Sequence, residues 1–334
     1  MKVRQDGTEL DEGTSACWRA LNLLADRVRG HGQPVRVCSL LIGDTPKVHL
    51  SSLRPPAGDG WRVSLVLDSD PTQHGPPPTA GESRYALQNL IMLRRLAEGA
   101  LPPAAAALLE LYVPYCVAPL HARRMGRPFT VSHFAQSLDG RIATRAGDSR
   151  WIGCAENRVH AHRMRALCDG ILIGARTLRT DRPALTVRHT EGSDPARIVV
   201  GGAVEDGDIA CLERAGPSPI LLIGDGEDLA SPQVERLPVP IQNGRIATAA
   251  ILRELYRREI LSVYIEGGAA TTSAFLAEGN IDVLQLHISP MIVGPGISSF
   301  SQPAIRCVSE SVRFDAHLYR SVGDGVMFVG RVAS

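Results

Sequence analysis

Two adjacent glycines, Gly267 and Gly268, stand between a strand pattern and a helix pattern. The segment SVYIEGGAATTSAFLAE (residues 262–278) opens with a short apolar run typical of a buried strand and ends in a run typical of a helix. A helix N-terminus attracts anions through its unpaired N–H groups and its dipole, and glycine leaves the backbone open to a ligand. The pattern therefore favours a cofactor diphosphate at this turn. The same pair of glycines is also a common way to make a plain turn.

Two further segments carry polar residues at fixed spacings. They are SLDGRIATRAGDSRWI (137–152) and HRMRALCDGILIGARTLRTDRPALTVR (162–188), the second of which contains T-x-x-x-D-x-P-x-L-T-V-R. Together with the later E-G-G-A, these motifs closely resemble the reductase domain of the bifunctional riboflavin deaminase/reductase family, from about residue 127 to the C-terminus. The resemblance implies an α/β fold, a dihydrofolate-reductase-like mixed sheet flanked by helices. It also implies NADPH-dependent reduction of 5-amino-6-(5-phosphoribosylamino)uracil, its diamino analogue or a related specialised substrate.

The resemblance also implies which positions contact NADPH. Part of this set is the glycine turn, where the strand-to-helix pattern independently favours a diphosphate. The implied cofactor positions are Ala135, Trp151, Thr177, Asp181, Gly267, Gly268, Ala269, Ala270, Thr271 and Thr272.

A second set of positions is implied to contact the phosphorylated ribosylamino-pyrimidine. Arginine suits such a site because its planar guanidinium can hold a phosphate through two parallel hydrogen bonds. Apart from the resemblance, Arg165 and Arg188 would be interpreted as exposed ion-pair residues. The implied substrate positions are Ser149, Arg165, Leu185, Arg188 and Glu266.

The implied reaction delivers a hydride to the anomeric carbon of a ribosylamine and leaves an open ribityl chain. The protein must orient two reactants and supply a proton, while the hydride chemistry belongs to the nicotinamide. Asp139, Asp181 and Glu266 are the carboxyl candidates for the proton. Glu266 is preferred as the catalytic residue because it directly precedes the cofactor turn, whereas Asp139 could simply cap a turn. A water molecule is an alternative donor.

Two departures from the family pattern concern ligand contacts. Gly201 and Gly202 follow a predicted strand where the family often has an aspartate and a small polar residue, and Arg182 stands where a second acidic residue is common. The adenosine-side contacts and the substrate's identity are therefore less well specified than the reaction type.

No metal site is predicted. His160 and His162 are two residues apart on a predicted helix and so project from different faces. The His189-Thr190-Glu191 triplet imitates the H-x-E of a zinc deaminase, but no P-C-x-x-C follows it. Because that signature is also absent from residues 1–126, deamination is not predicted.

The chain is predicted to form two domains, an α+β domain over residues 1–120 and the reductase domain over residues 126–334. In the first domain we expect a helix led by Trp18 and Leu21, a strand at 61–67, helices at 85–96 and 104–111, and a connection at 114–128. The alternation of strands and helices after residue 129 predicts the α/β sheet. Its expected strands are 129–134, 170–173, 197–200, 220–223, 262–265 and 283–288, with an antiparallel pair over 311–332. Its expected helices are 155–167, 249–259 and 270–278.

Composition limits the possible partners. A net charge of +1 gives no long-range attraction for nucleic acid or anionic lipid, and we expect neither as a partner. The polar N-terminus lacks the apolar core of a signal peptide, so we expect a cytoplasmic protein. The seven cysteines are scattered without a C-x-x-C spacing and are expected to be reduced. The resemblance implies a homodimer, and a non-catalytic nucleotide-binding or scaffold protein is the alternative from another class.

Overall fold

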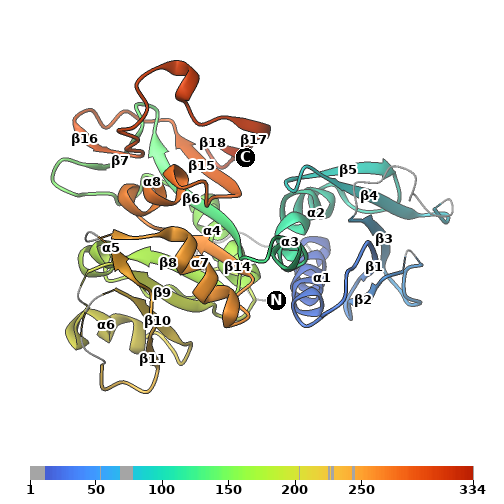
Figure 1. Cartoon of the computed structure of the whole chain (residues 1–334). Coiled ribbons are helices and arrows are strands. Elements are labelled where there is room, and N and C mark those ends of the chain that lie inside the picture. The colour runs from blue at the N-terminus through green and yellow to red at the C-terminus, as the bar shows by residue number, and fades with distance from the viewer. Residues whose placement is uncertain are drawn as a thin grey trace. The chain divides into compact units, whose positions relative to one another are not determined.

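The computed structural model describes residues 12–52, 54–67, 78–202, 204–224, 226, 229–242 and 245–333. The chain divides into two compact units, Met1–Arg124 and Met125–Ser334 (Figure 1).

The N-terminal unit contains a five-stranded sheet in the order β2-β1-β3-β4-β5. Strand β1 runs antiparallel to β2 and β3, β3 and β4 are parallel, and β4 and β5 form a hairpin. The strands are β1 (Val37–Ile42), β2 (Lys47–Leu50), β3 (Trp61–Val66), β4 (Glu82–Gln88) and β5 (Met92–Ala97). The strand predicted at 61–67 is confirmed.

Helices α1 (Glu12–Arg29) and α2 (Pro103–Cys116) pack together in this unit, and α3 (Ala118–Met125) follows α2. The Trp18 and Tyr112 rings meet edge to face at 5.4 Å. The helix stretch Pro103–Met125 is long and apolar enough to cross a membrane, but 72% of its most apolar window is buried within the protein, as in the core helix of a soluble protein. The helices predicted around Trp18 and at 104–111 are confirmed.

Two predictions for this unit are wrong. Residues 85–96, predicted as a helix, form most of the β4–β5 hairpin, whose turn holds Asn89 and Leu90 at positive φ. Pairing with β3 determines this segment, and a single-segment periodicity cannot show such pairing. Residues 114–128, predicted as a connection, are largely helical, and Pro114 lies inside α2.

The second unit is built on a nine-stranded sheet in the order β11-β10-β9-β8-β14-β6-β15-β18-β17. Strands β11 through β15 in this order are parallel, and β15, β18 and β17 pair antiparallel. The strands are β6 (Phe129–Ser137), β8 (Gly170–Gly174), β9 (Ala196–Val200), β10 (Ile220–Ile223), β11 (Val234–Arg236), β14 (Ser262–Ile265), β15 (Val283–Ser289), β17 (Phe314–Val322) and β18 (Gly325–Val332).

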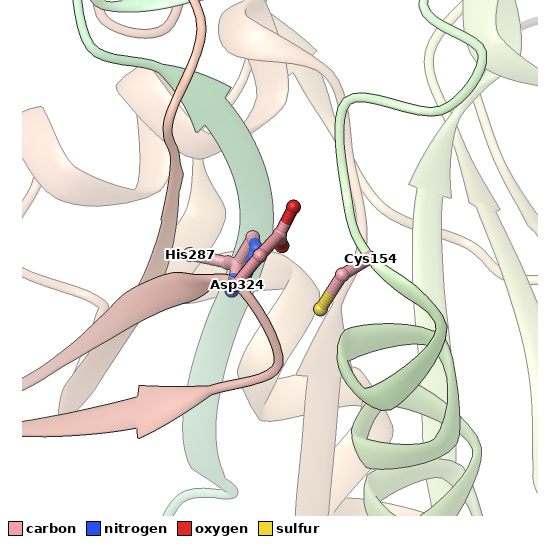
Figure 2. A group of neighbouring side chains, drawn as sticks. All are labelled: Cys154, His287 and Asp324. Carbon is pink, nitrogen blue, oxygen red and sulfur yellow. The ribbon is translucent and has the colours of Figure 1, made fainter.

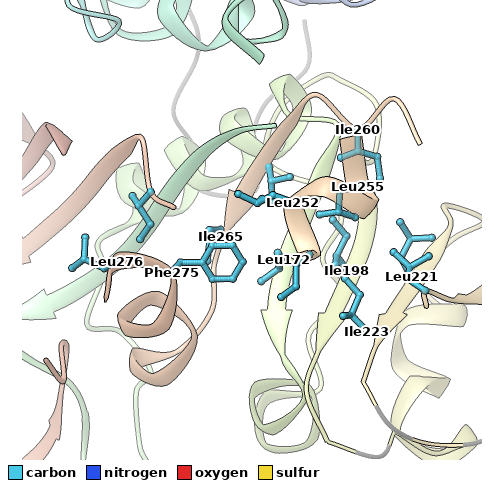
Figure 3. Packing of buried hydrophobic residues seen from close by; sticks show 14 residues of the cluster. Leu172, Ile198, Leu221, Ile223, Leu252, Leu255, Ile260, Ile265, Phe275 and Leu276 are labelled. Atoms are coloured by element: carbon cyan, nitrogen blue, oxygen red, sulfur yellow. The ribbon is translucent and has the colours of Figure 1, made fainter. Parts of the chain in front are cut away.

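Helices cover both faces of this sheet. On one face, α7 and α8 pack Leu252 and Phe275 over Leu172 and Ile198 (Figure 3). On the other, residues of α5 and α6 pack against Ile171 and neighbouring strand residues, and α4 contacts β15 through His160. The helices are α4 (Ala155–Leu167), α5 (Ala175–Asp181), α6 (Asp206–Glu213), α7 (Thr248–Arg257) and α8 (Ala269–Ala277).

Smaller elements complete the unit. They are β7 (Arg141–Thr144) paired with β16 (Gly296–Ser298), β12 (Ile241–Gln242) paired with β13 (Arg245–Ile246), and the 3-10 helix η1 (Val308–Glu310). Every strand and helix predicted after residue 129 is confirmed within a few residues, and the predicted mixed sheet flanked by helices is present. The elements that were not predicted are short. Helices α5 and α6 are among them, because their own sequences lack a strong apolar period.

Candidate functional site

The carboxyl end of β14 carries the glycine turn. Residues Glu266 to Gly268 join β14 to α8, and the carbonyl of Gly268 accepts a hydrogen bond from the N–H of Thr272 at 3.2 Å. The first N–H groups of α8 therefore have no partner within the helix. Because β14 is parallel to β8 and β6, this turn lies at the edge where α/β proteins bind ligands.

Two segments predicted to contact the cofactor meet at this turn. A β-carbon placed on Gly268 would lie 3.4 Å from Oγ1 of Thr177, which is on α5 after β8. The two residues are far apart in sequence and come together because β8 and β14 are neighbours. The β-carbon position of Gly268 meets no other atom within 4 Å outside its chain neighbours and the backbone of its own helix, so Thr177 is the side chain that borders the turn here.

The substrate positions Arg165 and Glu266 form a bidentate ion pair. Nε of Arg165 donates to Oε1 of Glu266 at 2.8 Å, and a terminal nitrogen donates to Oε2 at 2.6 Å. Their side chains are only 12% and 16% exposed. The pair joins the end of α4 to the end of β14, directly before the glycine turn.

Thr186 connects the two predicted phosphate-binding arginines. Arg165 donates to its carbonyl at 3.0 Å, and Arg188 donates to its hydroxyl at 3.2 Å. The backbone N–H of Arg188 donates to Nδ1 of His162 at 2.9 Å. Burial lowers the pKa of His162 to about 3, with a further contribution from Arg165, so this ring stays a neutral acceptor. The part played by His162 and Thr186 in holding these arginines could not be read from the sequence motifs.

Trp151 and Ala135 lie on a second part of the site. Trp151 has a φ of 67° and is 74% exposed, and the Arg158 guanidinium lies 5.0 Å from the centre of its ring. Two residues later, a β-carbon on Gly153 would lie 3.3 Å from that of Ala135. The segment that follows Trp151 therefore lies beside Ala135. The described contacts do not join Ser149 or Asp181, both exposed, to the other predicted positions, and Leu185 is buried at a positive φ.

Asp139 caps a turn. Its carboxylate accepts hydrogen bonds from Ser137 Oγ at 2.6 Å and from the N–H groups of Val293 and Gly294. The Ser137 hydrogen bond, followed by the Val293 N–H, lowers the pKa of Asp139 to about 2. An aspartate held in this way remains ionised at neutral pH and is a poor proton donor.

A buried polar layer lies on the sheet face covered by α4. His160 bonds to Gln285 at 2.9 Å, and the His133 ring stacks on Tyr264 at 5.9 Å. Burial lowers the pKa of His160 to about 4 and that of His133 well below its usual value. His160 points to the sheet while His162 bonds to the Arg188 backbone, so the two imidazoles face different partners, as their spacing predicts.

The fold and the site together define an α/β protein with a glycine turn and a helix N-terminus at the carboxyl edge of its parallel strands, the edge where proteins of this class bind ligands. The chain belongs to the RibD C-terminal domain family, whose model matches residues 128–328.

Two relatives illustrate the similarity. The riboflavin biosynthesis protein RibD of Aquifex aeolicus is 31% identical over 204 residues, which are 60% of this chain and 57% of that protein. RibD of Mycobacterium tuberculosis is 29% identical over 212 residues, or 62% and 56% of the two chains. The chain thus spans somewhat more than half the length of these relatives.

Solved structures show the same fold. Acinetobacter baumannii RibD matches with a TM-score of 0.61 and 19% identity, over 98% of this chain and 100% of that chain. The Saccharomyces cerevisiae riboflavin biosynthesis reductase Rib7 matches with a TM-score of 0.50 and 23% identity, over 62% and 90%. These likenesses confirm the dihydrofolate-reductase-like fold predicted for the second unit.

The Arg165–Glu266 pair generates a stability prediction. Glu266→Gln and Arg165→Met should each lower the unfolding free energy by about 3 to 5 kcal/mol, because each leaves one buried charge without its partner. The double variant should lose less than the sum of the two. Urea unfolding of the wild type, the two single variants and the double variant measures this coupling, with hydrogen exchange in β14 as the local readout.

The exposed pair Arg331–Asp315 on β18 and β17 supplies the matched control. Its own cycle should give about 0 to 1 kcal/mol, since solvent screens both charges. Equal coupling energies in the two cycles would contradict the role assigned to the buried pair.

Proposed function

We propose that this chain is an NADPH-dependent reductase that converts a phosphoribosylamino-pyrimidine into its ribitylamino form. The observation that carries the proposal is the Arg165–Glu266 ion pair, because it brings two predicted substrate positions together directly before the predicted cofactor turn. Membership of the RibD C-terminal domain family supports the same reaction. We assign the activity to residues 126–334 and no activity to residues 1–120.

The cofactor is proposed to bind with its diphosphate at Gly267, Gly268 and the first turn of α8. The N–H groups of Ala269, Ala270 and Thr271 are at the start of that helix, and Thr177 borders the space beside Gly268. Thr272 is buried, and its hydroxyl lies 3.2 Å from that of Ser132 and donates to the Gly267 carbonyl, so we assign it to supporting the turn. Trp151 and Ala135 form the more distant part of the same site.

The substrate phosphate is proposed to bind Arg188 and the remaining N–H groups of Arg165. Nε and the two terminal nitrogens of Arg165 each donate one hydrogen bond to Glu266 or Thr186. Two of its five N–H donors are left for a ligand. Arg188 is exposed, and its side chain donates a hydrogen bond to the Thr186 hydroxyl, so it is the more available of the two.

When bound, NADPH supplies a hydride to the anomeric carbon. The chain orients the two reactants, which alone can lower a barrier by several kcal/mol. Glu266 is the proposed proton-handling residue, acting directly or through a water that it holds, because it lies between the substrate arginine and the glycine turn. Asp139 is unsuited to this step because its low pKa and three donors keep it ionised. We further propose that the enzyme works in the cytoplasm.

The first prediction for this function concerns the turn. Gly268→Val should weaken NADPH binding by tenfold or more, because the added methyl groups fill the space between the turn and Thr177 and reach the backbone N–H groups. Calorimetric titration of the folded variant with NADPH measures the effect. Gly32→Val, where an added side chain meets nothing within 4 Å, should bind NADPH like the wild type. An unchanged affinity in Gly268→Val would show that the diphosphate binds elsewhere.

The second prediction concerns the phosphate. Arg188→Ala should raise the KM for the phosphorylated substrate by about ten- to a hundredfold and leave the KM for NADPH nearly unchanged. Steady-state NADPH oxidation with the deaminated and the diamino pyrimidine measures both constants. The exposed Arg214 provides the control, since Arg214→Ala should change neither. A loss confined to NADPH use would move Arg188 to the cofactor side.

A wild-type protein that binds NADPH and turns over neither pyrimidine would instead favour a nucleotide-binding scaffold. Dephosphorylated substrate tests whether Arg188 acts on the substrate phosphate or on the cofactor. If it acts on the phosphate, wild type and Arg188→Ala should react equally poorly with this substrate.

We propose that the chain forms a homodimer through this unit. Strand β17 ends the nine-stranded sheet, and Tyr319 on it is 63% exposed, so an unpaired edge and an apolar ring are available to a second copy. Light scattering across the micromolar range should give twice the chain mass, and Tyr319→Lys should shift the equilibrium toward the monomer. A wild-type monomer over that whole range would refute the assembly.

A further inference from the structure

Three potential metal ligands from distant parts of the chain meet beside α4. Cys154 precedes the first turn of α4, His287 is on β15, and Asp324 is in the turn between β17 and β18. One ligand atom from each lies within 4.8 Å of the others (Figure 2). None of the three belongs to the substrate or cofactor positions described above.

The buried imidazole of His287 has no hydrogen-bond partner among the described residues, at either ring nitrogen. The residue is 0% exposed. Burying an imidazole without a hydrogen bond costs free energy, commonly about 1 to 3 kcal/mol. A ligand bound to one ring nitrogen would remove part of this cost. The residue therefore points to an occupant of the space between His287, Cys154 and Asp324.

The turn Gly323-Asp324-Gly325 is shaped for close approach to this space. A β-carbon on Gly323 would lie 2.6 Å from Sγ of Cys154, and one on Gly325 would lie 2.8 Å from Nε2 of His287. Gly323 also has a φ of 59°, which glycine adopts readily. Only a turn without side chains on both sides of Asp324 fits here, and this fit brings the carboxylate to the thiol and the imidazole.

We propose that Cys154, His287 and Asp324 bind a Zn²⁺ ion. Thiolate sulfur, imidazole nitrogen and carboxylate oxygen are the three protein ligand types of zinc, and a thiolate disfavours Mg²⁺ and Ca²⁺. Zinc–ligand distances of about 2.0 to 2.3 Å place tetrahedral ligands roughly 3.5 Å apart, so the side chains need to close by about 1 Å.

Glu156 is the nearest further carboxylate, since its Oε2 lies against the β-carbon position of Gly323. It lies outside the group formed by the other three ligands, so its side chain would have to move to take the fourth position. The thiol becomes a second negative group beside Asp324 when it loses its proton to bind the ion. Sγ already accepts a hydrogen bond from the N–H of Asn157 at 3.3 Å, which remains available to a thiolate.

The ion would tie three elements together next to the cofactor region. His287 is the register partner of Ala135 on β6, and Cys154 follows Trp151 by three residues. A bound Zn²⁺ would therefore connect the segment that carries Trp151 to β15 and to the β17–β18 hairpin. We assign it a structural role there, since the site shares no residue with the Arg165–Glu266 pair.

The test measures metal binding without turnover, so its result is independent of the proposed reductase activity. Untagged, reduced and chelator-treated full-length protein is titrated with Co²⁺ and then with Zn²⁺. We expect one equivalent of Co²⁺ to bind with the visible bands of a tetrahedral site and a sulfur-to-cobalt charge-transfer band, and Zn²⁺ to displace it. Cys154→Ser should abolish the charge-transfer band, and His287→Gln and Asp324→Asn should weaken Zn²⁺ binding by at least about tenfold.

Cys307→Ser and His317→Gln are the matched controls, because both residues are exposed and lie outside the cluster. Both should bind one Zn²⁺ like the wild type. Cys154 is a half-buried helix cap and Asp324 lies in an exposed turn, so Cys154→Ser and Asp324→Asn should fold. These two variants keep the test decisive if His287→Gln does not fold. The absence of stoichiometric binding in the wild type, or binding that survives Cys154→Ser and Asp324→Asn unchanged, would overturn the proposal.

Discussion

Strand β14 pairs in parallel with both β8 and β6, although both of those strands lie far before it in the sequence. This insertion determines where the candidate site lies. Parallel neighbours end at the same edge of a sheet, so the segments that follow β8 and β14 are brought side by side. Thr177 and Gly268 meet because of this pairing. The same pairing brings the Glu266 carboxylate to Arg165 near the end of α4.

The Arg165–Glu266 ion pair gives this edge its geometry. Two nearly buried charges lose much of their hydration, and their attraction repays that cost only when the hydrogen bonds are well formed, as the bidentate contact is here. Such a pair contributes more to orientation than to stability. It holds a guanidinium and a carboxylate in fixed positions directly before the glycine turn.

The N-terminal unit shows the separation of fold from chemistry. The likeness to a whole RibD protein extends across this unit, yet residues 1–126 contain no H-x-E followed by P-C-x-x-C. Its sheet is held by packing between α1, α2 and the strands, as the Trp18–Tyr112 contact illustrates. Packing of this kind needs apolar side chains but no metal-binding residues. The fold of this unit alone therefore assigns no chemistry to it.

The amino-acid sequence by itself determined the strands and helices predicted after residue 129, the helix led by Trp18 and the strand-to-helix turn at Gly268, because each follows from a local pattern of apolar and polar residues. It also carried the motifs of the family. Only the tertiary structure decided that residues 82–97 form a hairpin, since strand pairing with β3 overrides the periodicity of that segment. The same holds for Arg165 with Glu266 and for Cys154 with His287. These residues are about a hundred or more positions apart, and only the order of strands in the folded sheet brings the first two into hydrogen bonding and the ligand atoms of the other two to within 4.8 Å.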